Sequence, residues 1–335
     1  MVLLFHTVPL LLLLLLSDSV SSQALTLNIR DNGKICSQWI KPGANGQFSV
    51  SYAQQPECIS AVAFEQANGQ ARLCCKGMPL TTPPANFPKE CGKQLYQPLR
   101  QRIIGGLIAH PNSWPWQVLV RGANNMCGGS LIDERHVLTA AHCIKNPVQV
   151  NDYKIIIGAH EINKPMYMEQ ELTVSKIWVH EQYAESTTAN DVAVIRLTKP
   201  IQLSDKVNII CLPGAEAKSV NDTVWVSGWG RTAHNGETSP ILKQTYMQTM
   251  GTKCSTYGND KFNQEKQICA SQHGVGYTCQ GDSGGPLMYE YEGRWYLNGV
   301  VSYGPTDCGV GTGLPSVFAR VKYYLSWIRS KMASS

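Results

Sequence analysis

The sequence predicts an all-β fold, a barrel or a sandwich, that ends in one helix. Short apolar runs alternate with turn residues throughout residues 103–335. Gly and Pro separate these runs, which is typical of short strands joined by tight turns. From 317 to 332, apolar Val321, Leu325 and Ile328 recur at helical spacing, which predicts a terminal helix packed on the β core. The clearest predicted strands lie at residues 116–120, 153–158, 192–197, 224–226 and 298–303.

The first 22 residues predict a secretory signal peptide. A leucine run at 10–16 is shorter than the roughly 20 apolar residues that span a bilayer, and small residues follow it at 20–22. We expect cleavage near Ser22 or Ala24 and a secreted, extracellular protein. The alternative is an uncleaved N-terminal anchor. No other stretch is long enough to span a bilayer, so no membrane partner is expected.

The chain has 335 residues and 12 cysteines. The length suits two domains, or one larger domain with an appendage. Cysteines that follow a signal peptide predict disulfides, because the extracellular space is oxidising. No C-x-x-C pair occurs in the sequence. We therefore expect no metal site and no cofactor.

Residues 23–80 are predicted to form a small cysteine-rich module. So short a segment buries little apolar surface, and disulfides would stabilise it. Adjacent Cys74 and Cys75 have the wrong geometry to bond each other. Two pairings remain open: 36–74 with 58–75, or 36–75 with 58–74. The proline-rich residues 81–102 predict an extended linker and activation segment, followed by a larger domain at 103–335.

The formal net charge of +5 is concentrated in the N-terminal part, where residues 23–102 carry nine Lys/Arg against four Asp/Glu. A polyanion-binding surface is one interpretation, and a dispersed, solvated surface is the one we favour. No dense Lys/Arg cluster occurs, so nucleic-acid binding is not expected.

Three separate motifs predict nucleophilic catalysis. Ser283 lies in Gly-Asp-Ser-Gly-Gly-Pro, His142 in Leu-Thr-Ala-Ala-His-Cys, and Asp191 in Asn-Asp-Val-Ala-Val. A serine hydroxyl becomes a useful nucleophile when a histidine removes its proton and a carboxylate orients that histidine. The order along the chain is His142, Asp191, Ser283, as in chymotrypsin-type enzymes.

With the Ile-Ile-Gly-Gly segment that begins at Ile103, these motifs make residues 103–335 resemble a chymotrypsin-fold serine endopeptidase of the S1 family. The resemblance implies two six-stranded antiparallel β-barrels with the active site in the cleft between them. It also implies an oxyanion hole formed by the backbone N–H groups of Gly281 and Ser283, with protein or peptide substrates and macromolecular inhibitors as partners. Glycine at 281 would allow an unusual backbone conformation.

The same resemblance makes Arg102–Ile103 a zymogen cleavage site for a trypsin-like protease. Cleavage would create a new α-ammonium on Ile103, which in this family pairs with the carboxylate beside the nucleophile, here Asp282. Pairing compensates a buried carboxylate that is otherwise costly.

Four disulfides follow from the resemblance: 127–143, 254–269, 279–308 and 91–211. The last would tether the activation segment after cleavage. A further bridge found in pancreatic relatives is absent, because its positions are held by Val224 and Tyr289.

The resemblance also assigns Tyr277, Gln280, Ser302, Gly304 and Ser316 to substrate binding. Trypsin-like members carry Asp where this chain has Tyr277, so we expect uncharged side chains at P1, the residue before the scissile bond. Gly304 would leave the pocket mouth open. In the alternative, Tyr277 points away and Ser316 forms the base. Asp307 would lie near the rim.

Two further sites follow from local sequence. The calcium loop of trypsin-like relatives would lie at 158–169, but Ala159 and Met166 replace acidic ligands, so calcium binding is not expected. Asn221-Asp222-Thr223 is an N-glycosylation sequon.

The sequence predicts a secreted serine endopeptidase zymogen, with an inactive homologue that acts as a binding protein as the alternative. A digestive and a regulatory role both remain open, and the N-terminal module favours the regulatory one.

Overall fold

The chain divides into two units, Met1–Thr82 and Pro83–Ser335. In the second unit the computed structural model describes residues 90–98, 107–123, 125–163, 170–214, 220–232, 236–251, 254, 262–271, 278–305 and 314–334. In the first unit it describes 23–25, 29–31, 34–36, 50–52, 63–68 and 70–76. The predicted signal peptide and most of the proline-rich linker lie outside these residues.

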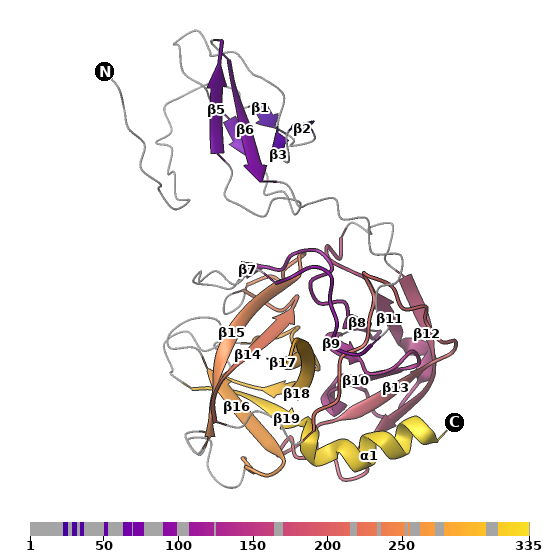
Figure 1. Ribbon diagram of the computed structural model, residues 1–335. Helices are drawn as coiled ribbons and strands as arrows, with labels where there is room; N and C mark the ends of the chain where they lie inside the picture. The colour runs from indigo at the N-terminus through magenta and orange to yellow at the C-terminus, as the bar shows by residue number, and fades with distance from the viewer. Residues whose placement is uncertain are drawn as a thin grey trace. The chain divides into compact units, whose positions relative to one another are not determined.

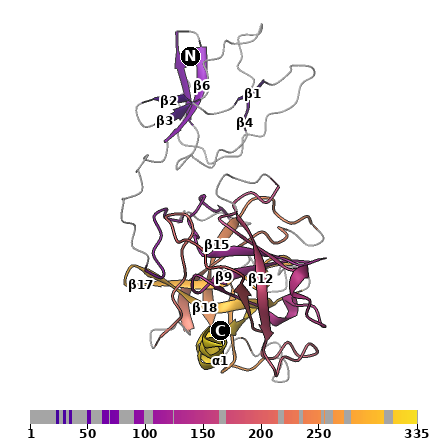
Figure 2. The same ribbon diagram turned by 90° about the vertical axis from the view of Figure 1, so that its right-hand side faces the viewer.

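The first unit contains two small sheets (Figure 2). Strand β1 (Gln23–Leu25) pairs in parallel with β4 (Val50–Tyr52). The second sheet is antiparallel, in the order β2 (Ile29–Asp31), β3 (Lys34–Cys36), β6 (Gln70–Lys76), β5 (Ala63–Ala67). Cys74 is buried, forms a disulfide and lies opposite Cys36 in the register of β3 and β6. Cys58 lies outside the described residues, so the choice between the two predicted pairings stays open.

The first half of the second unit is a closed antiparallel barrel (Figure 1). The predicted runs at 116–120, 153–158 and 192–197 each form one of its strands, and three more strands complete the ring. In order around the barrel the strands are β10 (His136–Thr139), β13 (Ala193–Leu197), β12 (Gln170–Val179), β11 (Lys154–Ile157), β8 (Gln117–Arg121) and β9 (Met126–Leu131). Short 3₁₀ turns at Ala141–Cys143 and Val150–Asp152 follow β10 and precede β11.

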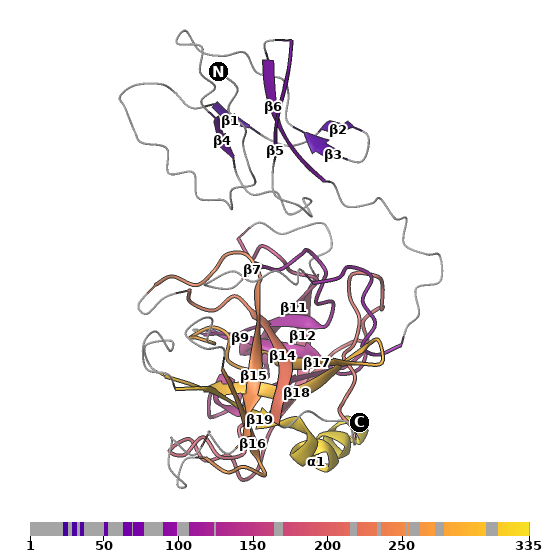
Figure 3. The ribbon, with the colours of Figure 1, turned by 60° about the vertical axis from the view of Figure 1, so that its left-hand side comes forward.

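The second half forms another six-stranded antiparallel barrel, closed by the pairing of β14 with β15 (Figure 3). In order around this barrel the strands are β14 (Val220–Gly228), β17 (Pro286–Tyr291), β18 (Arg294–Tyr303), β19 (Ser316–Arg320), β16 (Gln267–Ser271) and β15 (Lys243–Met250). The short β7 (Leu107–Ile108) adds to the outer side of β15. The prediction of two six-stranded barrels is confirmed.

The terminal helix α1 spans Val321–Ala333 and contacts β13 of the first barrel and β18 of the second. Buried Val321 and Ile328 face the barrels, as the helical spacing predicts. The predicted start at 317 was wrong, because residues 316–320 form β19. These residues pair with β16 and β18 on both sides, and barrel closure requires that strand. Among the described helices, none has both the length and the apolar character to cross a bilayer.

The two barrels pack through a shared apolar core. Trp116 on the rim of β8 is fully buried, and its indole N–H points to the Met288 sulfur of β17 at 3.0 Å. Trp114 stands edge-on to Trp295 and donates 2.8 Å to the Gln244 amide oxygen. Since a buried indole N–H needs an acceptor, these contacts fix how the barrels meet.

Candidate active site

His142 lies in the short turn that leaves β10, at the edge of the first barrel. Cys143 beside it forms the predicted disulfide with Cys127 of β9. The 3₁₀ turn and the bridge together hold the imidazole at a fixed place. His142 is partly exposed, with 28% of its side chain accessible.

Asp191 lies two residues before β13, the strand that pairs with β10, and only 1% of its side chain is exposed. Its Oδ1 accepts the backbone N–H of His142 at 2.9 Å, and its Oδ2 lies 2.7 Å from Nδ1 of His142. The preceding turn is held by Asn190, which has φ 55° and donates its side-chain amide to the Gln182 carbonyl at 2.7 Å. Asn tolerates this left-handed conformation better than most residues.

The environment of His142 shifts its basicity. Burial lowers the pKa of the imidazole, while the hydrogen bond and the charge of Asp191 raise it, and the net pKa lies above the ordinary 6.5. A carboxylate at Nδ1 also selects the tautomer that carries its proton there, which leaves Nε2 free as a base. The pair can therefore accept a proton near neutral pH and hold it.

Ser302, at the end of β18, joins this pair from the second barrel. Its hydroxyl donates 2.5 Å to Oδ2 of Asp191, and the residue is buried. The prediction assigned Ser302 to substrate binding. In the structure its hydroxyl is already engaged by the carboxylate, so only its backbone remains for a substrate.

Ser283 lies in the tight loop between Cys279 and β17. Gly281 and Gly284 adopt φ values of 98° and 78°, which side chains other than glycine rarely adopt. The Ser283 carbonyl accepts the Gly128 N–H of β9 at 2.7 Å, and the Gly284 N–H donates 2.8 Å to the Val301 carbonyl of β18. These bonds hold the loop against the edge of the first barrel that carries His142. His142 and Ser283, both described, make no hydrogen bond with each other, which is common before substrate binds.

Asp282 points away from Ser283 and into the second barrel. Its Oδ1 accepts the Gly230 N–H at 2.8 Å and its Oδ2 accepts the Cys279 N–H at 3.0 Å. Burial raises the pKa of Asp282 to about 6, although the two backbone hydrogen bonds lower it. This carboxylate lacks a cationic partner among the described residues. Arg102 and Ile103 lie outside them.

The structure describes some of the residues predicted to line the P1 pocket, but not all of them. Ser316 is fully buried, and its hydroxyl accepts from the Thr278 hydroxyl at 2.9 Å and the Thr278 N–H at 3.3 Å. A Cβ added at Gly304 would lie 3.6 Å from the Ser316 hydroxyl, so these two residues face one narrow space. Gln280 is exposed. Tyr277 and Asp307 lie outside the described residues.

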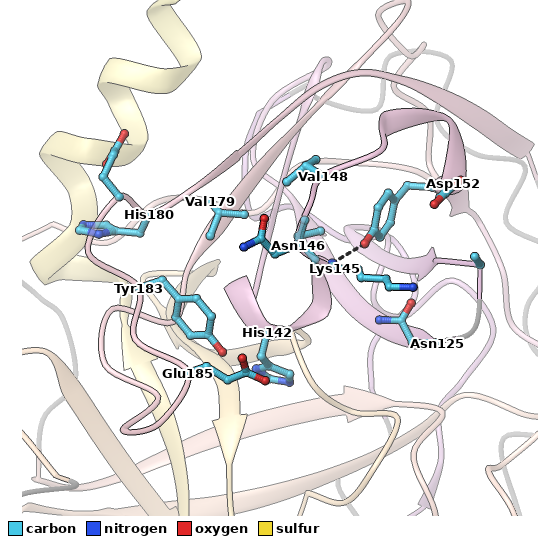
Figure 4. A pocket seen from close by; sticks show the side chains of 14 residues that line it. Asn125, His142, Lys145, Asn146, Val148, Asp152, Val179, His180, Tyr183 and Glu185 are labelled. Atoms are coloured by element: carbon cyan, nitrogen blue, oxygen red, sulfur yellow. Dashed lines mark hydrogen bonds between the residues drawn. The ribbon is translucent and has the colours of Figure 1, made fainter.

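A cavity of about 870 Å³ opens on the other side of His142 (Figure 4). It lies between the segments 144–153 and 179–185, and neither segment carries a motif that predicts a site. Tyr183 points toward the end where His142 lies. Burial raises the pKa of Tyr183 to about 12, and the charges of Asp191 and Glu185 add to that rise, so its phenol stays neutral at physiological pH.

One group of potential metal ligands includes His142. Of the described residues, only Cys127, His142 and Cys143 bring three ligand atoms within 4.8 Å of one another. The two cysteines are bonded to each other, so their sulfurs are not available as thiolates. Part of the predicted calcium loop, including Met166, lies outside the described residues.

The disulfides agree with the predictions where they can be tested. Cys91–Cys211 and Cys254–Cys269 are formed as predicted, along with Cys127–Cys143. Cys279 is also disulfide-bonded, while its predicted partner at 308 lies outside the described residues.

The sequence is similar to a known protein family and to individual members of it. Residues 103–328 match the family described as Trypsin. The chain is 36% identical over 257 residues to Chymotrypsin-C of Mus musculus, a match that covers 72% of this chain and 93% of that protein. It is 35% identical over 263 residues to Chymotrypsin-C of Bos taurus, covering 73% and 95%.

Proposed function

Because this chain belongs to the trypsin family of chymotrypsin-like serine endopeptidases, we propose that Ser283, His142 and Asp191 form its catalytic triad. The observation that carries the proposal is the 2.7 Å contact between Nδ1 of His142 and the buried Asp191 carboxylate. The loop of Ser283 is hydrogen-bonded to the same barrel edge through Gly128. As a serine endopeptidase, the protein acts on protein or peptide substrates.

In the proposed mechanism, Nε2 of His142 removes the proton of the Ser283 hydroxyl as the oxygen attacks the scissile carbonyl. Asp191 stays ionised and stabilises the imidazolium that forms. His142 then gives the proton to the leaving amine, which departs and leaves an acyl-enzyme on Ser283. Water, deprotonated by His142, attacks this ester and releases the second product, restoring the serine hydroxyl.

The oxyanion that forms in each step would accept the backbone N–H groups of Gly281 and Ser283. A positive φ at Gly281 is consistent with a peptide N–H turned toward this space. Preorganised donors of this kind typically contribute about 2.7–4 kcal/mol each to transition-state stabilisation. The hydrogen bonds of the Ser283 carbonyl and the Gly284 N–H hold the loop that would carry these donors.

We propose further that the protein is made as a zymogen, which a trypsin-like protease cleaves after Arg102. The new ammonium of Ile103 would pair with Asp282, whose carboxylate carries two backbone donors and a raised pKa. A cation at this point would compensate the buried charge. The Cys91–Cys211 bridge would then hold the activation segment to the protease unit.

The protease is proposed to prefer uncharged P1 residues. No acidic residue occupies position 277, and the hydroxyls of Thr278 and Ser316 are paired with each other. Secretion with removal of residues 1–22, regulation by macromolecular inhibitors and glycosylation at Asn221 belong to the same proposal. The module at 23–80 would direct the activity to a target, and its removal should lower turnover of natural substrates more than turnover of small peptides.

Active-site labelling tests the proposal. The full-length chain, activated by trypsin at Arg102, is expected to react with a fluorophosphonate probe and to cleave peptides with uncharged P1 residues. Ser283→Ala should lose both properties, and His142→Ala should lose turnover. A correctly cleaved, folded wild-type sample that neither reacts nor cleaves would support the alternative of an inactive homologue with a binding role.

A further inference from the structure

Residues 90–98, the described end of the predicted activation segment, pack against the barrels; we call them the docked segment. The Cys91–Cys211 bridge is one attachment between the two. Gly92 and Pro98 are buried, and residues 91 and 93–96 are partly buried. A single covalent link would leave most of such a short segment exposed, so further contacts hold it in place.

The backbone of Gly92 bonds to the barrels on both of its sides. Its N–H donates 2.8 Å to the Ile209 carbonyl, in the connection between β13 and β14, and its carbonyl accepts the Trp295 N–H of β18 at 2.9 Å. Gly92 has a φ of 71°, and a Cβ added there would lie 2.5 Å from the Trp295 carbonyl oxygen. Only glycine allows so close an approach in this conformation.

The side chain of Asn208 binds the same stretch of backbone. Its amide donates 3.2 Å to the Glu90 carbonyl and 2.9 Å to the Lys93 carbonyl. Asn208 is only 1% exposed, so its two amide protons depend on these acceptors. Leaving buried donors without partners is costly, and departure of the docked segment would remove both acceptors together.

Two charged side chains of the docked segment reach the hairpin between β17 and β18. The Glu90 carboxylate lies 2.7 Å from the Arg294 guanidinium, and the Lys93 ammonium donates 3.1 Å to the Gly293 carbonyl. These groups are exposed, so water and salt weaken both contacts. They add register to the segment, while the buried bonds of Gly92 and Asn208 contribute more of the affinity.

The far end of the docked segment is held by Tyr96. Its ring stacks on buried His110, with centroids 5.9 Å apart, and its hydroxyl donates 3.4 Å to Asp205. In the amide orientation that satisfies its neighbours, Gln94 accepts the Trp295 indole N–H at 3.1 Å. The contacts therefore run from residue 90 to residue 96 and do not centre on the disulfide.

None of these contacts involves Arg102 or Ile103, so cleavage between them would leave the contacts in place. We propose that the docked segment binds the barrels non-covalently, so that the N-terminal chain ending at Arg102 stays bound after cleavage even without the Cys91–Cys211 bridge. The inference rests on the proposed zymogen cleavage and deepens it by naming the lasting partner of the protease. The module at 23–80 would then remain with the active enzyme under reducing conditions too.

The full-length protein with Cys91→Ser and Cys211→Ser tests this inference. After trypsin cleavage, a denaturing gel should show two chains, and N-terminal sequencing should find Ile103 at the start of the larger one. Native size-exclusion chromatography at micromolar concentration should elute both chains together, at the position of the cleaved wild type. An N-terminal chain that elutes alone, while the barrels still react with a fluorophosphonate, would overturn the inference and leave the proposed function standing.

Two further substitutions in this background locate the binding. Gly92→Val should release the N-terminal chain, because its side chain would collide with the Trp295 backbone. Asn208→Ala should raise the dissociation constant about tenfold or more, through the loss of two hydrogen bonds. Gln97→Ala, the matched control at an exposed position of the same segment, should leave that constant unchanged. Equal retention in all three variants would contradict the assigned contacts.

The remaining outcomes separate the two proposals. If trypsin does not cut at Arg102, the zymogen proposal fails, and a viral-protease site in place of residues 99–102 still measures retention by the same chromatography. If the double serine variant does not fold, the inference fails, because the contacts would then be unable to replace the bridge.

Discussion

Ser302 donates a hydrogen bond to the same oxygen of Asp191 that lies 2.7 Å from Nδ1 of His142. His142 and Asp191 come from the first barrel, and Ser302 is the second-last residue of strand β18 in the second. The carboxylate is therefore oriented by both barrels. A change in how the barrels pack would move this oxygen and alter the orientation of the His142 imidazole.

Replacing Ser302 with Ala should lower kcat/KM about tenfold or more, because a hydrogen bond to a charged group is worth about 1.5 kcal/mol or more. Without this donor the carboxylate holds a proton on His142 more strongly, so the already raised pKa of His142 should rise further. The acid limb of the kcat/KM profile should move to higher pH. Ser302→Thr keeps the hydroxyl and should retain the wild-type midpoint. A loss of activity with no movement of the midpoint would show that Ser302 acts only through packing.

The raised pKa of Asp282 predicts a pH-dependent difference between the precursor and the cleaved protein. Its folded pKa of about 6 lies above the usual 3.8. At low pH, where the carboxyl is protonated in both the folded and the unfolded precursor, it does not lower the free energy of unfolding. As pH rises through 6, it lowers the free energy of unfolding of the precursor increasingly. The full cost is about 3 kcal/mol. In the cleaved protein the Ile103 ammonium would offset it.

Urea unfolding of an uncleavable Arg102→Gln precursor and of the cleaved wild type measures this difference. The cleaved form should be the more stable at pH 7.5, and the gap should be about 2 kcal/mol smaller at pH 4.5, where most of the precursor's Asp282 is neutral. A gap of equal size at both pH values would argue against pairing of Asp282 with the new amine.

Much of the fold could be predicted because strand patterns are local. The apolar runs at 116–120 and 192–197 sit within a residue of β8 and β13. The start of α1 could not be placed, because residues 316–320 form a strand only through neighbours on both sides. Propensity within a short window cannot include such long-range pairing.

The candidate site likewise combines residues that local sequence patterns predict with contacts that only the folded chain creates. Motifs located the residues proposed for catalysis, since each carries its own local pattern. The bond from Ser302 to Asp191 joins positions 111 residues apart, and no motif marks it. No motif marks Tyr183 or Glu185 either, because only the closed barrel brings their loop beside His142.

Substituting Ser316 with Gly should widen the proposed P1 pocket. The buried Ser316 hydroxyl and the Thr278 hydroxyl are bonded to each other, and Gly304 faces them across a narrow space. Removing the side chain should raise kcat/KM for Phe and Tyr at P1 severalfold relative to Ala and Val. Ser316→Ala removes the hydrogen bond but little volume, so it serves as the matched control. Equal changes in both variants would mean that pocket volume is not what Ser316 limits.

A buried histidine outside the active site should limit stability in acid. His160 is 4% exposed, and neither ring nitrogen has a hydrogen-bond partner among the described residues. Burial, helped by nearby His110 and opposed by Glu161, lowers the pKa of His160 to about 4. In the unfolded chain the pKa of His160 is near 6.5, so the unfolded state binds a proton at pH values where the folded state does not. The free energy of unfolding therefore falls by about 3 kcal/mol as pH drops from about 6.5 to 4.

His160→Phe should flatten this pH dependence in urea unfolding. Leu242→Ala, which removes a buried neighbour of His160, should lower the free energy of unfolding equally at both ends of the pH range. An unchanged slope in His160→Phe would exclude this histidine as the acid-sensitive group.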